Sequence, residues 1–117
     1  MYHRIIICGN LGNEPIMKYT TDGKAVTTFS VAASNRKDET LWFRVSAWEK
    51  LADVCGRYLK KGAKVLVEGT LRADGAGNPR VYERKDGLGW AASFEVVASS
   101  VKFLSGKDEP ADQEIAF

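Results

Sequence analysis

The chain of 117 residues is long enough for one domain with its own core, and its 44% hydrophobic and 27% charged residues are ordinary for a globular protein. It contains no apolar run of the roughly 20 residues that a membrane span needs and no signal-peptide pattern, which favours a cytoplasmic protein. Two cysteines and one histidine are too few ligands for a convincing zinc site. The sequence also contains no plausible Ser/His/Asp or Cys/His arrangement for nucleophilic catalysis. We therefore expect no metal, no cofactor and no catalysis.

Charge is distributed unevenly along the chain. The overall net charge of +2 combines a net +5 over residues 1–104 with a net −3 over residues 105–117. A basic body with an acidic end suggests two different partners, although an acidic tail can also serve solubility alone. We expect a folded domain over residues 1–104 and an acidic tail without fixed structure over residues 105–117.

Strand patterns separated by turn residues fill the first third of the chain. A β-branched run predicts a strand over residues 5–8, and a second extended segment over 17–21 leads to a hairpin turn at Asp22-Gly23. A long strand over residues 25–34 follows, and the charged segment 35–39 is predicted to be a hairpin loop.

The strand predicted over residues 40–48 carries the strongest functional signal. Alternation gives it a core face of Leu41, Phe43, Val45 and Ala47 and a second face of Trp42, Arg44, Ser46 and Trp48. Two large rings that flank a cation suit a single-stranded nucleic acid, whose bases stack and whose phosphates attract positive charge. The alternative is a strand buried on both faces, with its tryptophans against a helix or another subunit.

One helix is predicted, over residues 50–61. Its apolar residues recur at helical spacing along one side, and Gly62 is the expected stop signal. The helix explains Cys55 as a small buried residue, and we expect Cys8 to be a buried free thiol as well.

The last third of the chain predicts two strands and a hairpin. The strands are expected over residues 63–71 and 93–104, and the stretch over 72–92 between them reads as a long protruding hairpin. Three strands, one helix and two strands in this order describe an all-β, five-stranded OB-fold barrel with one short helix. That fold is a binding scaffold and does not by itself establish a function.

Several motifs in this order resemble those of the bacterial-type single-stranded DNA-binding proteins, the SSB family. The resemblance covers nearly all of residues 3–104 and rests on Asn10-Leu11-Gly12-Asn13-Glu14-Pro15, the GKAVTTFSVAAS segment from Gly23 to Ser34, Trp42-Phe43-Arg44-Val45, Tyr58-Leu59-Lys60-Lys61-Gly62 and Val67-Glu68-Gly69-Thr70-Leu71-Arg72. The last four residues, Glu114-Ile115-Ala116-Phe117, look like the acidic tip of the family. Ala116 stands where the family usually has proline, the tail is short, and the 35–39 loop lacks the aromatic residue of many relatives.

The resemblance implies a nucleoid-associated protein that coats single-stranded DNA in replication, repair and recombination, usually as a homotetramer. It implies stacking roles for Trp42 and Trp48, and Tyr82 and Trp90 of the hairpin are further candidates unless their rings close the hairpin or join subunits. The candidates for phosphate contact are Arg44 and Arg72 foremost, then Arg4, Arg36, Arg80 and Arg84. Asp112, Glu114, Ile115 and Phe117 are the expected contacts to partner proteins. A protein-binding adaptor and a binder of single-stranded RNA remain alternatives, because stacking alone does not read the 2′-OH.

Overall fold

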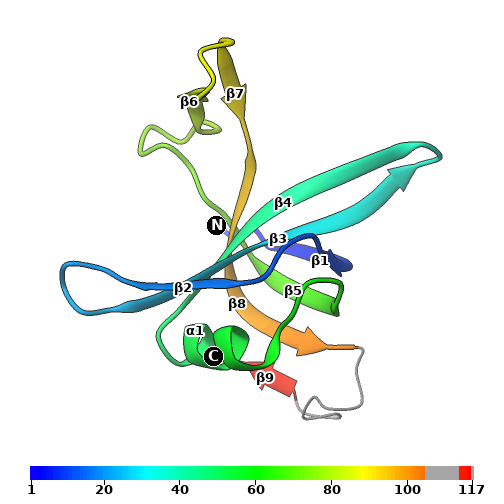
Figure 1. The fold of residues 1–117 in the computed structure, drawn as a ribbon, viewed down its shortest axis with the longest axis vertical. Helices are drawn as coiled ribbons and strands as arrows, with labels where there is room; N and C mark the ends of the chain where they lie inside the picture. Colours follow the sequence, from blue (N-terminus) through cyan, green and yellow to red (C-terminus); the bar gives the residue numbers. More distant parts are fainter. Residues whose placement is uncertain (105–113, 117) are drawn as a thin grey trace.

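Five strands close into a barrel in the computed structural model, which describes residues 1–104 and the backbone of 114–116 (Figure 1). They are β1 (Ile5–Leu11), β3 (Ala25–Arg36), β4 (Glu39–Trp48), β5 (Lys64–Leu71) and β8 (Phe94–Phe103). The neighbour order is β1-β5-β8-β4-β3, and pairing of β1 with β3 closes the ring. Only the pairing of β4 with β8 is parallel among these strands. This confirms the predicted OB-fold barrel.

The other elements decorate the barrel. The helix α1 (Lys50–Tyr58) lies across one end, and β2 (Ile16–Tyr19) extends the sheet beyond β3. The short strands β6 (Val81–Glu83) and β7 (Trp90–Ala92) pair with each other and project from the barrel as the predicted hairpin (Figure 1). No helix in the described part of the chain is long and apolar enough to cross a membrane.

The acidic end was expected to have no fixed structure. Residues 105–113 and 117 lie outside the described residues, whereas Glu114–Ala116 form a short strand, β9, antiparallel to β8.

The buried apolar side chains of β4 follow the predicted alternation. Phe43, Val45 and Ala47 of β4 face the core, and Leu41 packs at its edge. Phe29 of β3 is the largest fully buried side chain. The remaining buried apolar residues of the described chain are Ile7, Leu11, Val31, Leu51, Ala52, Cys55, Leu59, Val65, Val67, Val96, Ala98, Val101 and Phe103.

The helix ends three residues earlier than predicted. Leu59 is already extended, with φ −82° and ψ 146°, and its side chain is buried in the core. The chain must turn here to meet β1, since the Gly62 amide donates to the Leu11 carbonyl and the Leu11 amide donates to the Ala63 carbonyl. Gly62, with φ +90°, therefore serves this turn rather than the helix end.

Cys8 was predicted to be buried, and this is wrong. It stands between Ile7 and Gly9, which point inward, so the alternation of β1 places its thiol on the outer surface. Cys55 is buried as predicted, and burial raises the pKa of its thiol to about 12.

The two thiols should differ sharply in reactivity. We expect a chromogenic disulfide reagent at pH 8 to titrate one thiol, Cys8, in the folded protein and two after denaturation, because the buried Cys55 forms almost no thiolate. The Cys8→Ser variant should lose the fast reaction. Two fast thiols in the folded wild-type protein would contradict the burial of Cys55.

Candidate nucleic-acid interface

The outer face of β4 and its neighbour β3 presents the residues that the sequence singled out. The register sets Trp48 opposite Val26, Ser46 opposite Thr28, Arg44 opposite Ser30 and Trp42 opposite Ala32. Residues directly opposite each other on antiparallel strands share a face. The two tryptophans therefore stand at the two ends of a floor made of short side chains.

Both tryptophan rings are accessible. Trp42 is 54% exposed and Trp48 is 36% exposed, so the strand is not buried on both faces. Six residues of strand separate them by about 20 Å, enough for several nucleotides. Gly12 supports the ring of Trp42, since a Cβ at Gly12 would lie only 2.4 Å from its Cζ3 atom. A side chain at position 12 would have to push the indole aside.

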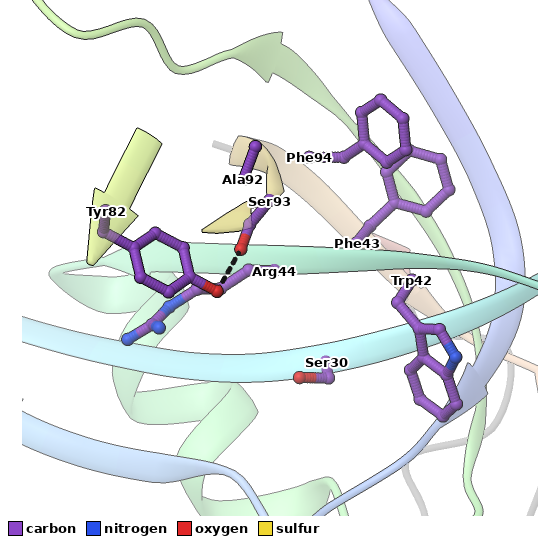
Figure 2. Close-up of a pocket in the computed structure, with 8 residues that line it drawn as sticks. All are labelled: Ser30, Trp42, Phe43, Arg44, Tyr82, Ala92, Ser93 and Phe94. Carbon is purple, nitrogen blue, oxygen red and sulfur yellow. Dashed lines mark hydrogen bonds between the residues drawn. The ribbon is translucent and has the colours of Figure 1, made fainter. Parts of the chain in front are cut away.

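A cleft of about 430 Å³ opens beside Trp42, between the barrel and the base of the hairpin (Figure 2). It is lined by Ser30, Trp42, Phe43, Arg44, Tyr82, Ala92, Ser93 and Phe94. A smaller hollow of about 200 Å³ is lined by Asn13, Ile16, Thr28, Phe29, Ser30 and Arg44. Ser30 and Arg44 belong to both, so Arg44 stands where the two hollows meet.

Arg44 provides the positive charge on the outer face of β4. It is exposed, and within residues 1–104 no carboxylate pairs with it and no side-chain hydrogen bond holds it. Figure 2 shows its side chain extending below the ring of Tyr82. A free guanidinium between exposed aromatic rings can bind a phosphate while the flanking bases stack.

The two aromatic residues predicted on the hairpin are placed differently. Tyr82 lines the cleft, and its hydroxyl lies 3.2 Å from Ser93 Oγ. Trp90 is opposite Glu83 in the ladder, whereas Tyr82 is opposite Ala91, so the two rings occupy opposite faces of the hairpin. Trp90 does not line the cleft, although it is 70% exposed.

Phe94 is a cleft residue that the sequence reasoning missed. Its ring centroid lies 5.6 Å from that of Phe43, and the two rings form one wall of the cleft (Figure 2). Phe94 shares its face of β8 with Val96 and Ala98, which reads as a core position. Phe94 pairs with Phe43 of β4, but the pairing of β8 with β5 begins only at Val96, and the ring is 55% exposed.

Arg72 and Arg80 lie close to the cleft but already have a partner. Both guanidiniums pair with Glu95 Oε1, from Arg80 Nη1 at 3.1 Å and from Arg72 Nη1 at 3.8 Å. Glu95 is the second residue that the sequence reasoning missed, because an isolated glutamate within a strand carries no motif.

The other three arginines that were predicted to contact phosphates line neither the cleft nor the smaller hollow. Arg4 pairs with Glu68 at 3.6 Å, and Arg84 pairs with Asp86 at 2.6 Å within the loop of the hairpin. Arg36 is at the far end of β3, at the tip of the β3–β4 hairpin. The structure brings Arg44, Arg72 and Arg80 together and leaves these three outside the group.

The predicted partner contacts at the C-terminus are mostly beyond what the structure shows. Asp112 and Phe117 lie outside the described residues, and only the backbone of Glu114 and Ile115 is described, within β9.

Comparison with known proteins agrees with this geometry. The model of the single-strand binding protein family matches residues 2–104. The chain belongs to this family. It is 36% identical over 115 residues to the single-stranded DNA-binding protein of Neisseria meningitidis serogroup A, covering 92% of this chain and 62% of that protein. It is 37% identical to that of Xanthomonas campestris, covering 92% and 63%, and 32% identical to single-stranded DNA-binding protein 1 of Chlorobaculum tepidum, covering 91% and 67%.

The chain spans less than two thirds of the length of the first two relatives. The names of all three describe binding proteins rather than enzymes, in agreement with the prediction of no catalysis.

Proposed function

We propose that this protein binds single-stranded DNA with little regard to base sequence. The observation that carries the proposal is the outer face of β4, where two exposed tryptophans flank a guanidinium that pairs with no carboxylate of residues 1–104. Every base has a flat face that can stack on an indole, and phosphate contacts carry no sequence information. The printed names of the relatives support DNA as the ligand.

The surface suggests one path for the strand. From Trp48 it would cross the floor of short side chains, pass a phosphate over Arg44 and reach Trp42. The cleft beyond, between Tyr82 and Phe94, has room for a base to stack. Each stacked base contributes about 1–3 kcal/mol to binding.

Tryptophan fluorescence tests the proposal directly. We expect titration with an oligothymidylate to quench the emission, and the affinity to fall as salt is raised. Unchanged emission at micromolar protein would contradict DNA binding and favour a protein-binding adaptor. An oligouridylate titrated in parallel separates the DNA-binding reading from an RNA-binding one.

Arg44→Gln should weaken binding and flatten its salt dependence. The loss of one phosphate contact is expected to reduce the slope of log K against log salt by about 0.7, uniformly across DNA sequences. The matched control is Arg84→Gln, which removes the same charge from a guanidinium that is paired with Asp86 away from the cleft. Equal slope changes in the two variants would mean that Arg44 acts only through net charge.

The biological setting that we propose follows from the family. The protein would protect single-stranded DNA in replication, repair and recombination, in the cytoplasm at the nucleoid, as a homo-oligomer and by resemblance a tetramer. Light scattering on the pure protein measures that state.

The acidic tip is proposed to recruit other genome-maintenance proteins through Asp112, Glu114, Ile115 and Phe117, with carboxylates for steering and the phenylalanine as an apolar anchor. Deletion of residues 114–117 should leave DNA affinity equal or slightly higher while partner binding is lost. A large loss of DNA affinity, measured by the same fluorescence titration, would contradict this role.

A further inference from the structure

Glu95 is an acidic side chain placed within the cationic part of the interface. Only 10% of its side chain is exposed. Its Oε1 accepts a hydrogen bond from Arg80 Nη1 at 3.1 Å and forms an ion pair with Arg72 Nη1 at 3.8 Å. Its backbone carbonyl also accepts the Arg72 amide, at 2.8 Å. In the parallel register of β4 and β8 it stands directly beside Arg44. One carboxylate therefore pairs with two guanidiniums and lies on the strand next to a third arginine.

The pairs made by Glu95 also hold the hairpin in place. Arg72 directly follows β5 and Arg80 directly precedes β6, so the two arginines bracket the segment that leads into the hairpin. The hydrogen bond between the hydroxyl groups of Tyr82 and Ser93 is a second interaction at the base of the hairpin. Tyr82 and Ser93 line the 430 Å³ cleft, and Glu95 directly follows the cleft residue Phe94 in β8.

A phosphate could take the place of this carboxylate. Both groups present anionic oxygens that match the N–H donors of a guanidinium. Within residues 1–104, the only side-chain hydrogen bond that either guanidinium makes is the one from Arg80 Nη1 to Glu95 Oε1, so both have N–H donors left for a phosphate. Two guanidiniums share one carboxylate, so the group carries an excess of one positive charge that an incoming phosphate can neutralise.

We propose that Glu95 occupies Arg72 and Arg80 in the unbound protein and yields them to phosphates when a nucleic acid enters the cleft. The inference rests on the proposed function. In this exchange Glu95 is a positioning residue that lowers the affinity for single-stranded DNA and makes that affinity less dependent on salt. DNA binding would also release the ion pairs at the base of the hairpin. Arg72 and Arg80 then contact DNA by exchange of partners, whereas Arg44 is available from the start.

Glu95→Gln tests the exchange, with Glu68→Gln as the matched control. Glu68 also pairs with an arginine, Arg4, but it is neither next to a cleft residue in sequence nor paired with Arg44 in the sheet, as Glu95 is, and the change in net charge is the same. We expect Glu95→Gln to bind an oligothymidylate about tenfold more tightly at low salt, the size of one charge-assisted hydrogen bond. Its salt slope should steepen by about 0.7 for each released guanidinium. Glu68→Gln should change affinity less than about twofold.

Repeating the Glu95→Gln substitution in a protein that lacks both arginines keeps the test independent of any folding defect in the single variant. In a protein that carries Arg72→Gln and Arg80→Gln, the salt slope should be shallower than in wild type, and adding Glu95→Gln should then gain no more affinity than Glu68→Gln does. Weaker binding by Glu95→Gln, equal gains in the two single variants, or an unchanged slope in the double variant would overturn the inference. If wild type fails to bind the oligonucleotide, the proposed function itself fails, which is a distinct result.

Discussion

Trp42→Ala is expected to weaken binding of single-stranded DNA by about 1–3 kcal/mol, which corresponds to a loss of roughly 5- to 150-fold in affinity. The indole is 54% exposed and adjoins both the floor of β4 and the cleft, so its loss removes a stacking platform. No charge changes, and the salt slope should therefore stay as in wild type. Anisotropy of a fluorescently labelled oligothymidylate measures both quantities.

Two further variants sharpen this result. Trp90→Ala removes a ring that is more exposed than Trp42 but lies on the far face of the hairpin, and it should change affinity little. Gly12→Ala leaves Trp42 in the chain but displaces its indole, because the new Cβ would meet Cζ3 at 2.4 Å. It should therefore give part of the loss seen with Trp42→Ala. Equal losses from Trp42→Ala and Trp90→Ala would contradict the stacking face.

The barrel was predictable because its strands bury one face each. Strict alternation in β4 identified Phe43 and Val45 as core residues, and turn residues marked the strand ends. A local sequence pattern does not show which distant strand the following residues must contact. The helix stops at Tyr58 because the following residues turn to bond with Leu11 of β1, which is 47 residues earlier in the chain. Cys8 shows the same limit, since an apolar run does not reveal which of its residues face outward.

The interface was predictable to the extent that one strand carries it. Trp42, Arg44 and Trp48 share a face of β4 by alternation alone, and the structure keeps them there. The cleft is different, since it needs the hairpin to be folded over β4 and the end of β8. Its residues come from four separate segments of the chain, at positions 30, 42–44, 82 and 92–94, and Phe94 and Glu95 gain their roles only from that juxtaposition.

The sequence shows which arginines are present but not which carboxylates form ion pairs with them. Arg44, Arg72 and Arg80 look alike as isolated residues, yet among residues 1–104 the first pairs with no carboxylate and the other two share a largely buried one. A cation that already has a partner adds less to phosphate binding than a free one, because the existing pair must first be broken. The number of basic residues near an interface therefore overstates the number of phosphate contacts that they add.

Gly9→Ala is expected to lower the free energy of unfolding by about 3 kcal/mol, the upper end of the usual cost of overpacking. Gly9 lies where β1 leaves β5 and approaches β3 to close the barrel. A Cβ there would lie 2.1 Å from the Ala32 carbonyl oxygen and 3.0 Å from Val31 Cγ1. A backbone carbonyl within a paired strand cannot move aside as a flexible side chain can, so β1 and β3 must separate.

Thermal unfolding followed by circular dichroism measures this effect, and we expect a fall in Tm of about 10–20 °C. The control is Gly56→Ala in α1, where the new Cβ would meet the Thr27 hydroxyl at 3.2 Å and Met17 Sδ at 3.4 Å. Alanine favours the helix over glycine by about 1 kcal/mol, which offsets that tighter contact and leaves Tm nearly unchanged. A Gly9→Ala protein as stable as the Gly56→Ala protein would mean that close approach of β1 to β3 is not what closes this barrel.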